Sequence, residues 1–274
     1  MHLLAEITGR ILASQAETVA LALSECGSEH GLAINPDVSF HPASLVKVCL
    51  MLEVFHQVHQ GLCSLDDLLP VKNEFHSLAD RSPFSLAAGD DSETDLYTHI
   101  GQKLPVRDLV TRMITRSSNL AANILIEKFT PDRVTDFMHK LGADGIFVRR
   151  GVEDYKAFVR GLNNAATAQS FLHILKKLAL RQVISPTASQ SMLDILKQQY
   201  FHEGIPARLP AGIPIAHKTG WNGKLYHDAA IIYPPDSEPY ALVIMTSGLA
   251  DDKEAPALVA SLSKLLYDRQ PEWR

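Results

Sequence analysis

The chain has 274 residues, of which 46% are hydrophobic and 21% are charged. This composition is ordinary for a globular protein with one large core or two joined lobes, and it excludes the disordered and fibrous classes. The 26 basic and 31 acidic residues give a net charge of −5, without the basic excess that binding to many phosphates requires, so we expect no nucleic-acid partner.

The cysteines and the N-terminus carry the signals of compartment. Cys26, Cys49 and Cys63 are an odd number without a CxxC pair, so we expect reduced thiols rather than a disulfide framework or a cysteine zinc site. The first residues lack the basic region and apolar stretch of a secretory leader, and no segment is long and apolar enough to span a bilayer. As written, the sequence predicts a cytoplasmic protein, or a periplasmic or extracellular one if a leader was removed.

The first predicted elements are a helix over 1–15, a strand over 18–24 that alternates as a half-buried strand does, and a short strand over 31–35. Residues 44–60 are apolar on all sides, which predicts a central, buried helix ending at Gly61. Residues 62–104 are interrupted by prolines and glycines and contain an acidic run at 90–95. We expect a long surface excursion there with little regular structure and a solvated acidic run.

Further helices are predicted over 106–129, 131–142, 167–180, 186–198 and 253–267, and strands over 215–219, 229–233 and 240–246, with 143–164 irregular and a linker at 204–214. Strands near both ends of the chain predict an α+β fold with one sheet of about five mainly antiparallel strands, flanked by helices. We expect residues 1–40 and 205–274 to form an α/β lobe and residues 41–204 a helical lobe, with a cleft between them. Together they would make a single catalytic domain.

Ser44 and Lys47 form an S-x-x-K pattern at the start of the predicted central helix, where residues three apart lie on one face and can meet. Serine alone is a poor nucleophile, but a neighbouring amine whose pKa is lowered by burial can take its proton. The first turn of a helix also leaves free backbone N–H groups beside the serine. About one such pattern is expected by chance in a chain of this length, and we interpret a second match, from Ser261 to Lys264, as accidental.

Two more patterns follow along the chain. An S-x-N pattern at 117–119 interrupts a helical run, where serine and asparagine side chains compete with helical hydrogen bonds and predict a break. A K-T-G pattern at 218–220 ends an apolar strand, where glycine lets a substrate approach the backbone and lysine offers a positive charge to an anion. Taken alone, the first also fits a polar link between helices, and the second fits a strand-to-turn transition.

The three patterns in this order resemble the motif set of class A β-lactamases and penicillin-binding serine hydrolases. The segment LAANIL at 120–125 and the order of the elements are similar as well, so the resemblance spans nearly the whole chain. It implies a β-lactamase/DD-peptidase-like fold and an acyl-enzyme mechanism on β-lactams or D-alanyl-D-alanine-like peptides. It implies neither a cofactor nor a metal.

Carried onto this chain, the resemblance implies that Ser44 attacks the substrate carbonyl and that Lys47 helps to deprotonate it. Ser117 would relay a proton to the leaving nitrogen, and Asn119 would orient Lys47 and the substrate amide. These are the roles that the first two motifs carry in the family.

The resemblance also implies how a substrate is held at the K-T-G strand. The backbone N–H groups of Ser44 and Trp221 would form the oxyanion hole, and Gly220 would let the substrate approach. Lys218 and Thr219 would hold a substrate carboxylate. The Trp221 side chain is either a rim aromatic for the substrate or a plain hydrophobic cover.

One departure concerns the step that releases the product. Class A enzymes complete hydrolysis with a loop glutamate that a leucine-asparagine step closely follows. Glu153 is the best positional match and the remaining catalytic candidate, but position 157, where the asparagine is expected, is Ala157. In the alternative interpretation, Glu153 pairs with Arg149 or Arg150 and has a structural role.

Two other departures concern charge. The middle residue of S-x-N is commonly aspartate in class A enzymes, and here it is Ser118. On the strand after K-T-G, where many class A enzymes have an arginine, this chain has His227 followed by Asp228. His227 is either a pH-dependent contact for a substrate carboxylate or a structural histidine bonded to Asp228.

The leading hypothesis is therefore a monomeric hydrolase of the class A type that opens β-lactams. A second hypothesis keeps Ser44 and Lys47 in a D-alanyl-D-alanine peptidase or esterase that β-lactams acylate and that deacylates slowly. A third is a non-catalytic sensor domain that binds β-lactams. The lack of a leader disfavours a periplasmic role in antibiotic defence.

Overall fold

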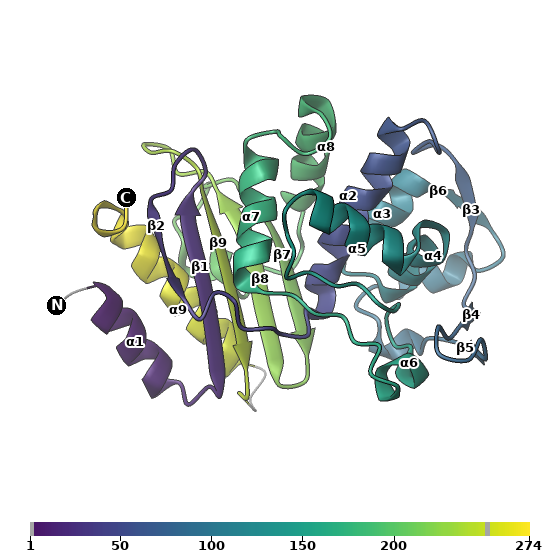
Figure 1. The fold of residues 1–274 in the computed structure, drawn as a ribbon, viewed down its shortest axis with the longest axis horizontal. Helices are drawn as coiled ribbons and strands as arrows, with labels where there is room; N and C mark the ends of the chain where they lie inside the picture. Colours follow the sequence, from purple (N-terminus) through teal and green to yellow (C-terminus); the bar gives the residue numbers. More distant parts are fainter. Residues whose placement is uncertain (1–2, 250–252) are drawn as a thin grey trace.

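The computed structural model describes residues 3–249 and 253–274 (Figure 1). The predicted helix over 1–15 and the predicted lobes extend in part outside these residues. Within the described residues, five strands form one antiparallel sheet in the order β2-β1-β9-β8-β7, which confirms the expected sheet built from both ends of the chain. The strands are β1 (Thr18–Glu25), β2 (Gly31–Ile34), β7 (Ile215–Asn222), β8 (Leu225–Ile232) and β9 (Tyr240–Ser247).

Strand β1 is buried on both faces from Val19 to Ser24, whereas its sequence pattern predicts a half-buried strand. The run from Val19 to Leu23 is apolar at every position, as in a strand covered on both sides. Strand β9 is likewise buried from Tyr240 to Thr246. Both strands therefore need a layer of helices on each face of the sheet.

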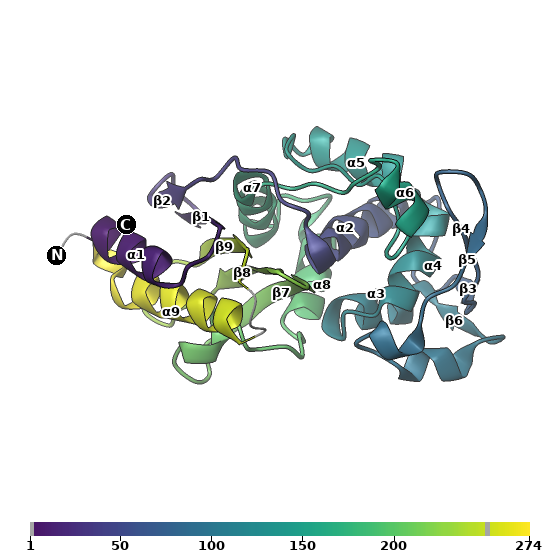
Figure 2. The same cartoon turned by 90° about the horizontal axis from the view of Figure 1, so that it is seen from below.

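The two layers come from different parts of the chain. Helices α1 (Leu3–Ala13) and α9 (Glu254–Asp268) lie side by side on one face of the sheet, and α7 (Ala168–Ala179) lies on the other (Figures 1 and 2). The first face forms one apolar cluster with the terminal helices, and the second forms a cluster that continues into the other helices. Helix α7 lies in the range predicted as the helical lobe, yet it packs on the sheet. The division into two lobes stays a prediction.

Helix α2 (Val46–His59) is the centre of the helical group beside the sheet, and its side chains are buried from Lys47 to Phe55. It packs against α3 (Val106–Thr115), α4 (Asn119–Phe129), α5 (Pro131–Lys140) and α8 (Pro186–Leu196). A helix surrounded in this way must be apolar all round. The predicted central, buried helix is confirmed.

The excursion over 62–104 contains two short antiparallel pairs, of β3 (Leu68–Pro70) with β6 (Lys103–Pro105) and of β4 (Phe75–His76) with β5 (Pro83–Phe84). It also contains the 3-10 turns η2 (Ala88–Asp90) and η3 (Asp95–His99).

The segment 143–164, predicted as irregular, includes the short helix α6 (Tyr155–Val159), which Asp154 caps through the Ala157 N–H. The other 3-10 turns of the described residues are η1 (Ala43–Leu45), η4 (Ile205–Arg208) and η5 (Gln270–Glu272). No described helix has the length and apolarity to cross a membrane.

Candidate active site

Ser44 lies in the 3-10 turn η1 (Ala43–Leu45), directly before α2. The preceding Ala43 has a φ of 47°, a left-handed conformation that is strained for a residue with a side chain. Ser44 lines a cavity of about 290 Å³ together with Ser117, Thr219 and Trp221. The nucleophile predicted from the sequence therefore opens onto a cavity that residues of all three motifs share.

Strand β7 passes close to η1, and Gly220 makes this approach possible. A Cβ at position 220 would lie 3.1 Å from the Pro42 carbonyl oxygen and 3.1 Å from the Ser44 backbone nitrogen. Only a residue without a side chain fits there without moving one backbone or the other. The approach brings the Gly220 backbone beside the Ser44 N–H, as an oxyanion hole between the N–H groups of Ser44 and Trp221 requires.

The Lys47 ammonium lies at the centre of the site and is fully buried. Its Nζ donates to Ser44 Oγ at 3.1 Å, to Asn119 Oδ1 at 2.7 Å and to the Ser117 carbonyl oxygen at 2.6 Å. Burial lowers the pKa of Lys47 to about 7, against the opposing effect of Asp91 and Glu153. An amine with this pKa is partly neutral at physiological pH and can accept the proton of Ser44.

Ser117 lies in the break between α3 and α4, with a φ of 57°. Its Oγ accepts a hydrogen bond from Lys47 Nζ at 3.3 Å and another from Lys218 Nζ at 3.0 Å. The helix break predicted from serine and asparagine is confirmed here. It places one hydroxyl between two lysines, a position from which a proton can pass to a leaving group.

Lys218 is fully buried, and its Nζ also donates to the Thr219 carbonyl oxygen at 2.8 Å. Burial and the nearby Lys47 hold the pKa of Lys218 well below its ordinary value. Thr219 faces the cavity, and Trp221 is 56% exposed at its rim. Of the two interpretations of Trp221, its exposure favours the rim aromatic.

Glu153 reaches the same group from the loop before α6. Its Oε1 accepts a hydrogen bond from Asn119 Nδ2 at 3.1 Å, and burial raises the pKa of its carboxyl. Two hydrogen bonds between the Asn123 side chain and the Val152 backbone, of 2.8 and 2.7 Å, hold the loop next to Glu153. Sequence reasoning missed this role of Asn123, although the residue lies in the LAANIL segment.

The alternative pairing of Glu153 with arginine is not found. The Arg149 guanidinium donates to the Asn163 carbonyl oxygen, and that of Arg150 donates to the Gly151 carbonyl oxygen and contacts His41. Glu153 is therefore joined to Asn119 of the site rather than to its neighbours in the sequence.

His227 differs from both of its predicted roles. It is fully buried, and its Nε2 donates to the His41 carbonyl oxygen at 2.9 Å while its Nδ1 accepts from the Thr246 N–H at 3.3 Å. These bonds fit a neutral ring, and burial lowers the pKa of His227 to about 4. Asp228 bonds His217 instead, at 3.1 Å. We therefore do not keep His227 among the substrate contacts.

The prediction of a solvated acidic run at 90–95 is also wrong in part. Asp91 and Glu93 are buried, and Asp91 accepts hydrogen bonds from the Asn119 and Leu120 N–H groups at the start of α4. Glu93 pairs with Arg112 of α3 at 2.5 Å. Nothing in the local sequence indicates this role of Asp91, because its partners on α4 lie 28 and 29 positions further along the chain.

Two other features that could suggest chemistry lack the required partners. In the second S-x-x-K pattern, Ser261 accepts from Arg10, and Lys264 pairs with Asp268.

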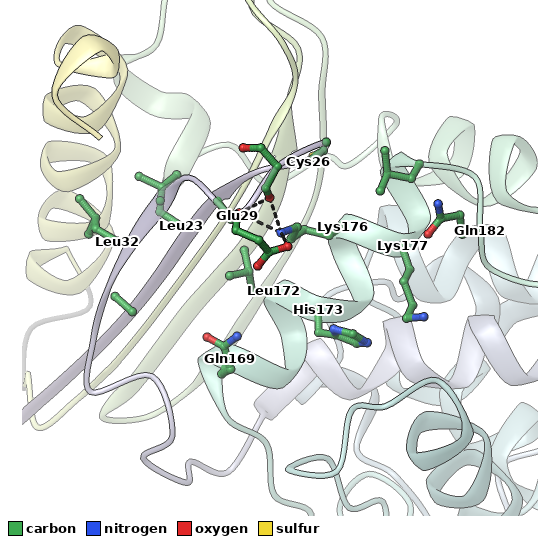
Figure 3. A pocket seen from close by; sticks show the side chains of 16 residues that line it. Leu23, Cys26, Glu29, Leu32, Gln169, Leu172, His173, Lys176, Lys177 and Gln182 are labelled. Atoms are coloured by element: carbon green, nitrogen blue, oxygen red, sulfur yellow. Dashed lines mark hydrogen bonds and ion pairs between the residues drawn. The ribbon is translucent and has the colours of Figure 1, made fainter. Parts of the chain in front are cut away.

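A cavity of about 560 Å³ lies between α7 and the β1–β2 hairpin (Figure 3), where Lys176 Nζ is 3.2 Å from Glu29. Burial raises the pKa of its Cys26 thiol to about 12, so this thiol is not a thiolate at neutral pH. The described residues contain no cluster of His, Cys, Asp and Glu that could hold a metal.

A serine hydrogen-bonded to a buried lysine, and a second serine between two lysines, are the arrangement found in serine hydrolases of the S-x-x-K type. Residues 3–270 match the sequence profile described as the β-lactamase enzyme family. The chain belongs to this family, and it is a serine hydrolase of the β-lactamase type.

Individual relatives are distant but cover nearly the whole chain. The extended-spectrum β-lactamase PER-1 of Pseudomonas aeruginosa is 25% identical over 97% of this chain and 86% of its own length. A β-lactamase structure from Sphaerobacter thermophilus superposes with a TM-score of 0.83 at 23% identity, covering 97% of both chains. A variant of PBP-A, solved as its acyl-enzyme complex with penicillin G, gives a TM-score of 0.84 at 21% identity, with 98% of this chain and 96% of that chain covered. These likenesses confirm the expected fold.

Proposed function

We propose that this protein is a β-lactamase of the class A type, which opens the β-lactam amide through an acyl-enzyme on Ser44. The observation that carries the proposal is the buried Lys47 ammonium, whose Nζ is 3.1 Å from Ser44 Oγ and 2.7 Å from Asn119 Oδ1. A lysine whose pKa is about 7 in this position can act as the base for the serine. We propose further that one chain is sufficient, because every group named in the mechanism comes from the same chain.

In the acylation step, neutral Lys47 takes the Ser44 proton as Oγ forms a bond to the β-lactam carbonyl carbon. Negative charge develops on the carbonyl oxygen, and N–H groups at Ser44 and Trp221 stabilise it, a contribution of roughly 3 kcal/mol for one such donor. The carbon–nitrogen bond then breaks, and the nitrogen takes a proton from the Ser117 hydroxyl. The Lys47 ammonium returns a proton to Ser117, from which it lies 3.3 Å away.

In the deacylation step, the Glu153 carboxylate takes a proton from a water molecule as the water oxygen bonds to the ester carbon on Ser44. The bond from this carbon to Ser44 Oγ then breaks, and the proton that Glu153 took returns to Oγ. The hydrogen bond from Asn119 Nδ2 supports this role because it holds Glu153 beside the same lysine. Burial raises the pKa of Glu153, which makes the carboxylate a stronger base than an exposed one.

A second candidate is a D-alanyl-D-alanine peptidase or esterase that β-lactams acylate and that releases the acyl group slowly. One observation favours it. Ala157, four positions after Glu153, ends in a buried methyl group, and a methyl group cannot orient a water for attack as an asparagine amide can. Acylation is common to both candidates, and the rate of deacylation separates them.

The test follows turnover of a chromogenic cephalosporin and the mass of the protein in parallel, for wild type, Ser44→Ala and Glu153→Gln. The proposal expects turnover by wild type, no adduct on Ser44→Ala and an accumulating adduct on Glu153→Gln. Ser261→Ala, in the second S-x-x-K pattern, is the matched control and should react as wild type does. A wild-type protein that acylates once and stalls supports the peptidase or esterase. Absence of both turnover and adduct contradicts the proposal and favours a non-catalytic sensor.

The monomer is tested separately by light scattering on a size-exclusion column. A mass of one chain is expected, with full specific activity on dilution. A dimer whose activity falls on dilution would contradict this part of the proposal.

A further inference from the structure

Asp91 is a buried carboxylate, 6% exposed, in the surface excursion between α2 and α3. Its oxygens accept hydrogen bonds from the backbone N–H groups of Asn119 at 2.9 and 3.0 Å and of Leu120 at 2.9 Å. The Tyr97 hydroxyl donates to it at 3.1 Å, and so does the Glu93 N–H. All these donors are neutral, so the negative charge is held at the start of α4 without a direct ion pair among them.

These bonds complete the first turn of α4. A helix start leaves its first N–H groups without intrahelical partners. Asp91 binds those of Asn119 and Leu120, and the Ser118 hydroxyl accepts from the Ala121 N–H at 3.2 Å. A carboxylate in this place also favours the positive end of the helix dipole. The backbone that carries Asn119 is therefore fixed by a residue from a different part of the chain.

The Asn119 side chain transmits this placement to the reacting groups. Its Oδ1 accepts from Lys47 Nζ at 2.7 Å, and its Nδ2 donates to Glu153 at 3.1 Å. The charged groups that act on the Lys47 ammonium are Asp91, Glu153 and Lys218. Asp91 and Glu153 raise the pKa of Lys47, and burial lowers it.

The carboxylate of Asp91 corresponds to one that class A enzymes have within the S-x-N motif itself. Class A enzymes commonly have S-D-N, with a carboxylate in the middle position, and here that position is the neutral Ser118. Asp91 brings a carboxylate to the same helical turn from the preceding excursion. The chain thus has one negative charge at the start of α4, from a different position in the sequence.

We propose that Asp91 is a positioning residue of this active site, which fixes Asn119 against the Lys47 ammonium and supplies the carboxylate that the S-x-N motif lacks. The inference depends on the proposed function only in taking Lys47 as the base. Asp91 touches neither Ser44 nor a substrate in this role, and it acts through Asn119 and through its charge.

The test is a direct titration of Lys47, which needs no substrate. Lysine carrying ¹³C at Cε is incorporated, the Lys47 resonance is assigned with Lys47→Arg, and its shift is followed against pH in Asp91→Asn and Asp95→Asn. Asp95 is the matched control, because it lies on the same excursion, its side chain is 63% exposed, and it pairs with Arg112. Loss of the Asp91 charge should lower the pKa of Lys47 by roughly one unit, and loss of the Asp95 charge should leave it unchanged. Equal titration curves in the two folded variants would overturn the inference.

The acylation rate tests the positional part. Asp91→Glu keeps the charge but shifts the carboxylate by one methylene, so it should titrate as wild type does and acylate roughly 10-fold more slowly. Should Asp91→Asn fail to fold, Asp91→Glu decides, and wild-type acylation in that variant overturns the inference. If β-lactams do not acylate the wild type, the proposed function fails. The titration still tests the role of Asp91 in that case. A Lys47 pKa that is lowered in Asp91→Asn and unchanged in Asp95→Asn supports the inference.

Discussion

The Lys47 ammonium is removed from water and donates to four protein oxygens, and its burial sets the pH at which the amine can accept a proton. Its pKa is lowered to about 7 by burial, and only the neutral amine can take the Ser44 proton. We expect the rate of adduct formation to rise with pH and to level off above a midpoint at about pH 7. The measurement is the pseudo-first-order rate of the mass increase between roughly pH 5 and pH 9.

The same profile has an internal control. Glu153 raises the pKa of Lys47, so Glu153→Gln should move the midpoint to lower pH while leaving Ser44 reactive. A midpoint that stays in place in Glu153→Gln, or a flat profile in the wild type, would contradict the role of Lys47 as the base.

At the residue scale, the sequence was informative where partners are close in the chain. Ser44 and Lys47 are three apart on a helix, so their meeting follows from helical geometry. Asp91 could not be found in this way, because a carboxylate in an acidic run has the pattern of a solvated surface and its partners on α4 are distant in the sequence. The predicted hydrogen bond between His227 and Asp228 is wrong, and the sequence pattern alone excludes it. Consecutive residues of a strand point to opposite faces, so a bond between the two was excluded by strand geometry.

At the scale of elements, the approach of β7 to η1 depends on the missing side chain of Gly220. We expect Gly220→Ala to push the strand away from Ser44, because its Cβ would be 3.1 Å from two backbone atoms. Acylation should fall by roughly 10- to 100-fold if the oxyanion hole is built from these two backbones. Rate constants for adduct formation in the folded variant measure this loss.

Gly27 provides the comparison for this prediction, because a Cβ there meets nothing within 4 Å. Gly27→Ala should leave acylation unchanged. Equal rates for Gly220→Ala and wild type would mean that the oxyanion is bound elsewhere.

The contact of β8 with the segment before η1 should make stability depend on pH. The folded-state pKa of His227 is about 4, below the ordinary value of about 6.5. As the pH falls below about 6.5, His227 takes up a proton in the unfolded chain but not in the folded chain. The free energy of unfolding therefore decreases until the pH reaches about 4. The full effect on the free energy of unfolding is about 3 kcal/mol.

Denaturant unfolding at several pH values between these limits measures this loss. His41, whose pKa burial lowers to about 4, contributes in the same direction. His227→Gln removes one of the two titrations, so its stability should fall less steeply with pH. A slope equal to that of wild type would show that His227 is not the source.

The elements themselves were largely predictable, since the central helix and all five strands of the sheet follow from apolar patterns and turn residues. Helix α6 was not found, because its exposed Tyr155 and Val159 do not form an apolar face. The burial of β1 on both faces was indicated locally, because every residue from Val19 to Leu23 is apolar, but the helix that covers one face, α7, begins 143 positions after the last residue of the strand.

At the scale of the whole molecule, the two tryptophans report on different regions. Trp221 is at the rim of the cavity, whereas Trp273 is 6% exposed, packs on Tyr240 and donates to the Leu266 carbonyl oxygen. We expect Trp221→Phe to remove the fluorescence change on acylation and to keep the unfolding signal. Trp273→Phe should have the opposite effect. Fluorescence titration and thermal unfolding of both variants test this. An acylation signal that survives in Trp221→Phe would contradict the placement of Trp221 at the rim of the cavity.

The place of β9 in the sheet has a consequence for biosynthesis. This strand inserts between β1 and β8, so the hairpin made first, β1 with β2, has no partner along β1 until residues 240–247 have left the ribosome. Pairings this distant close large loops and form slowly. During synthesis, β1 remains an apolar strand with one unpaired edge, and such an edge is a site for wrong association. Nascent chains of this protein should therefore depend on chaperones until the last strand emerges, and ribosome-bound chains that stop before β9 should be protease-sensitive and catalytically silent.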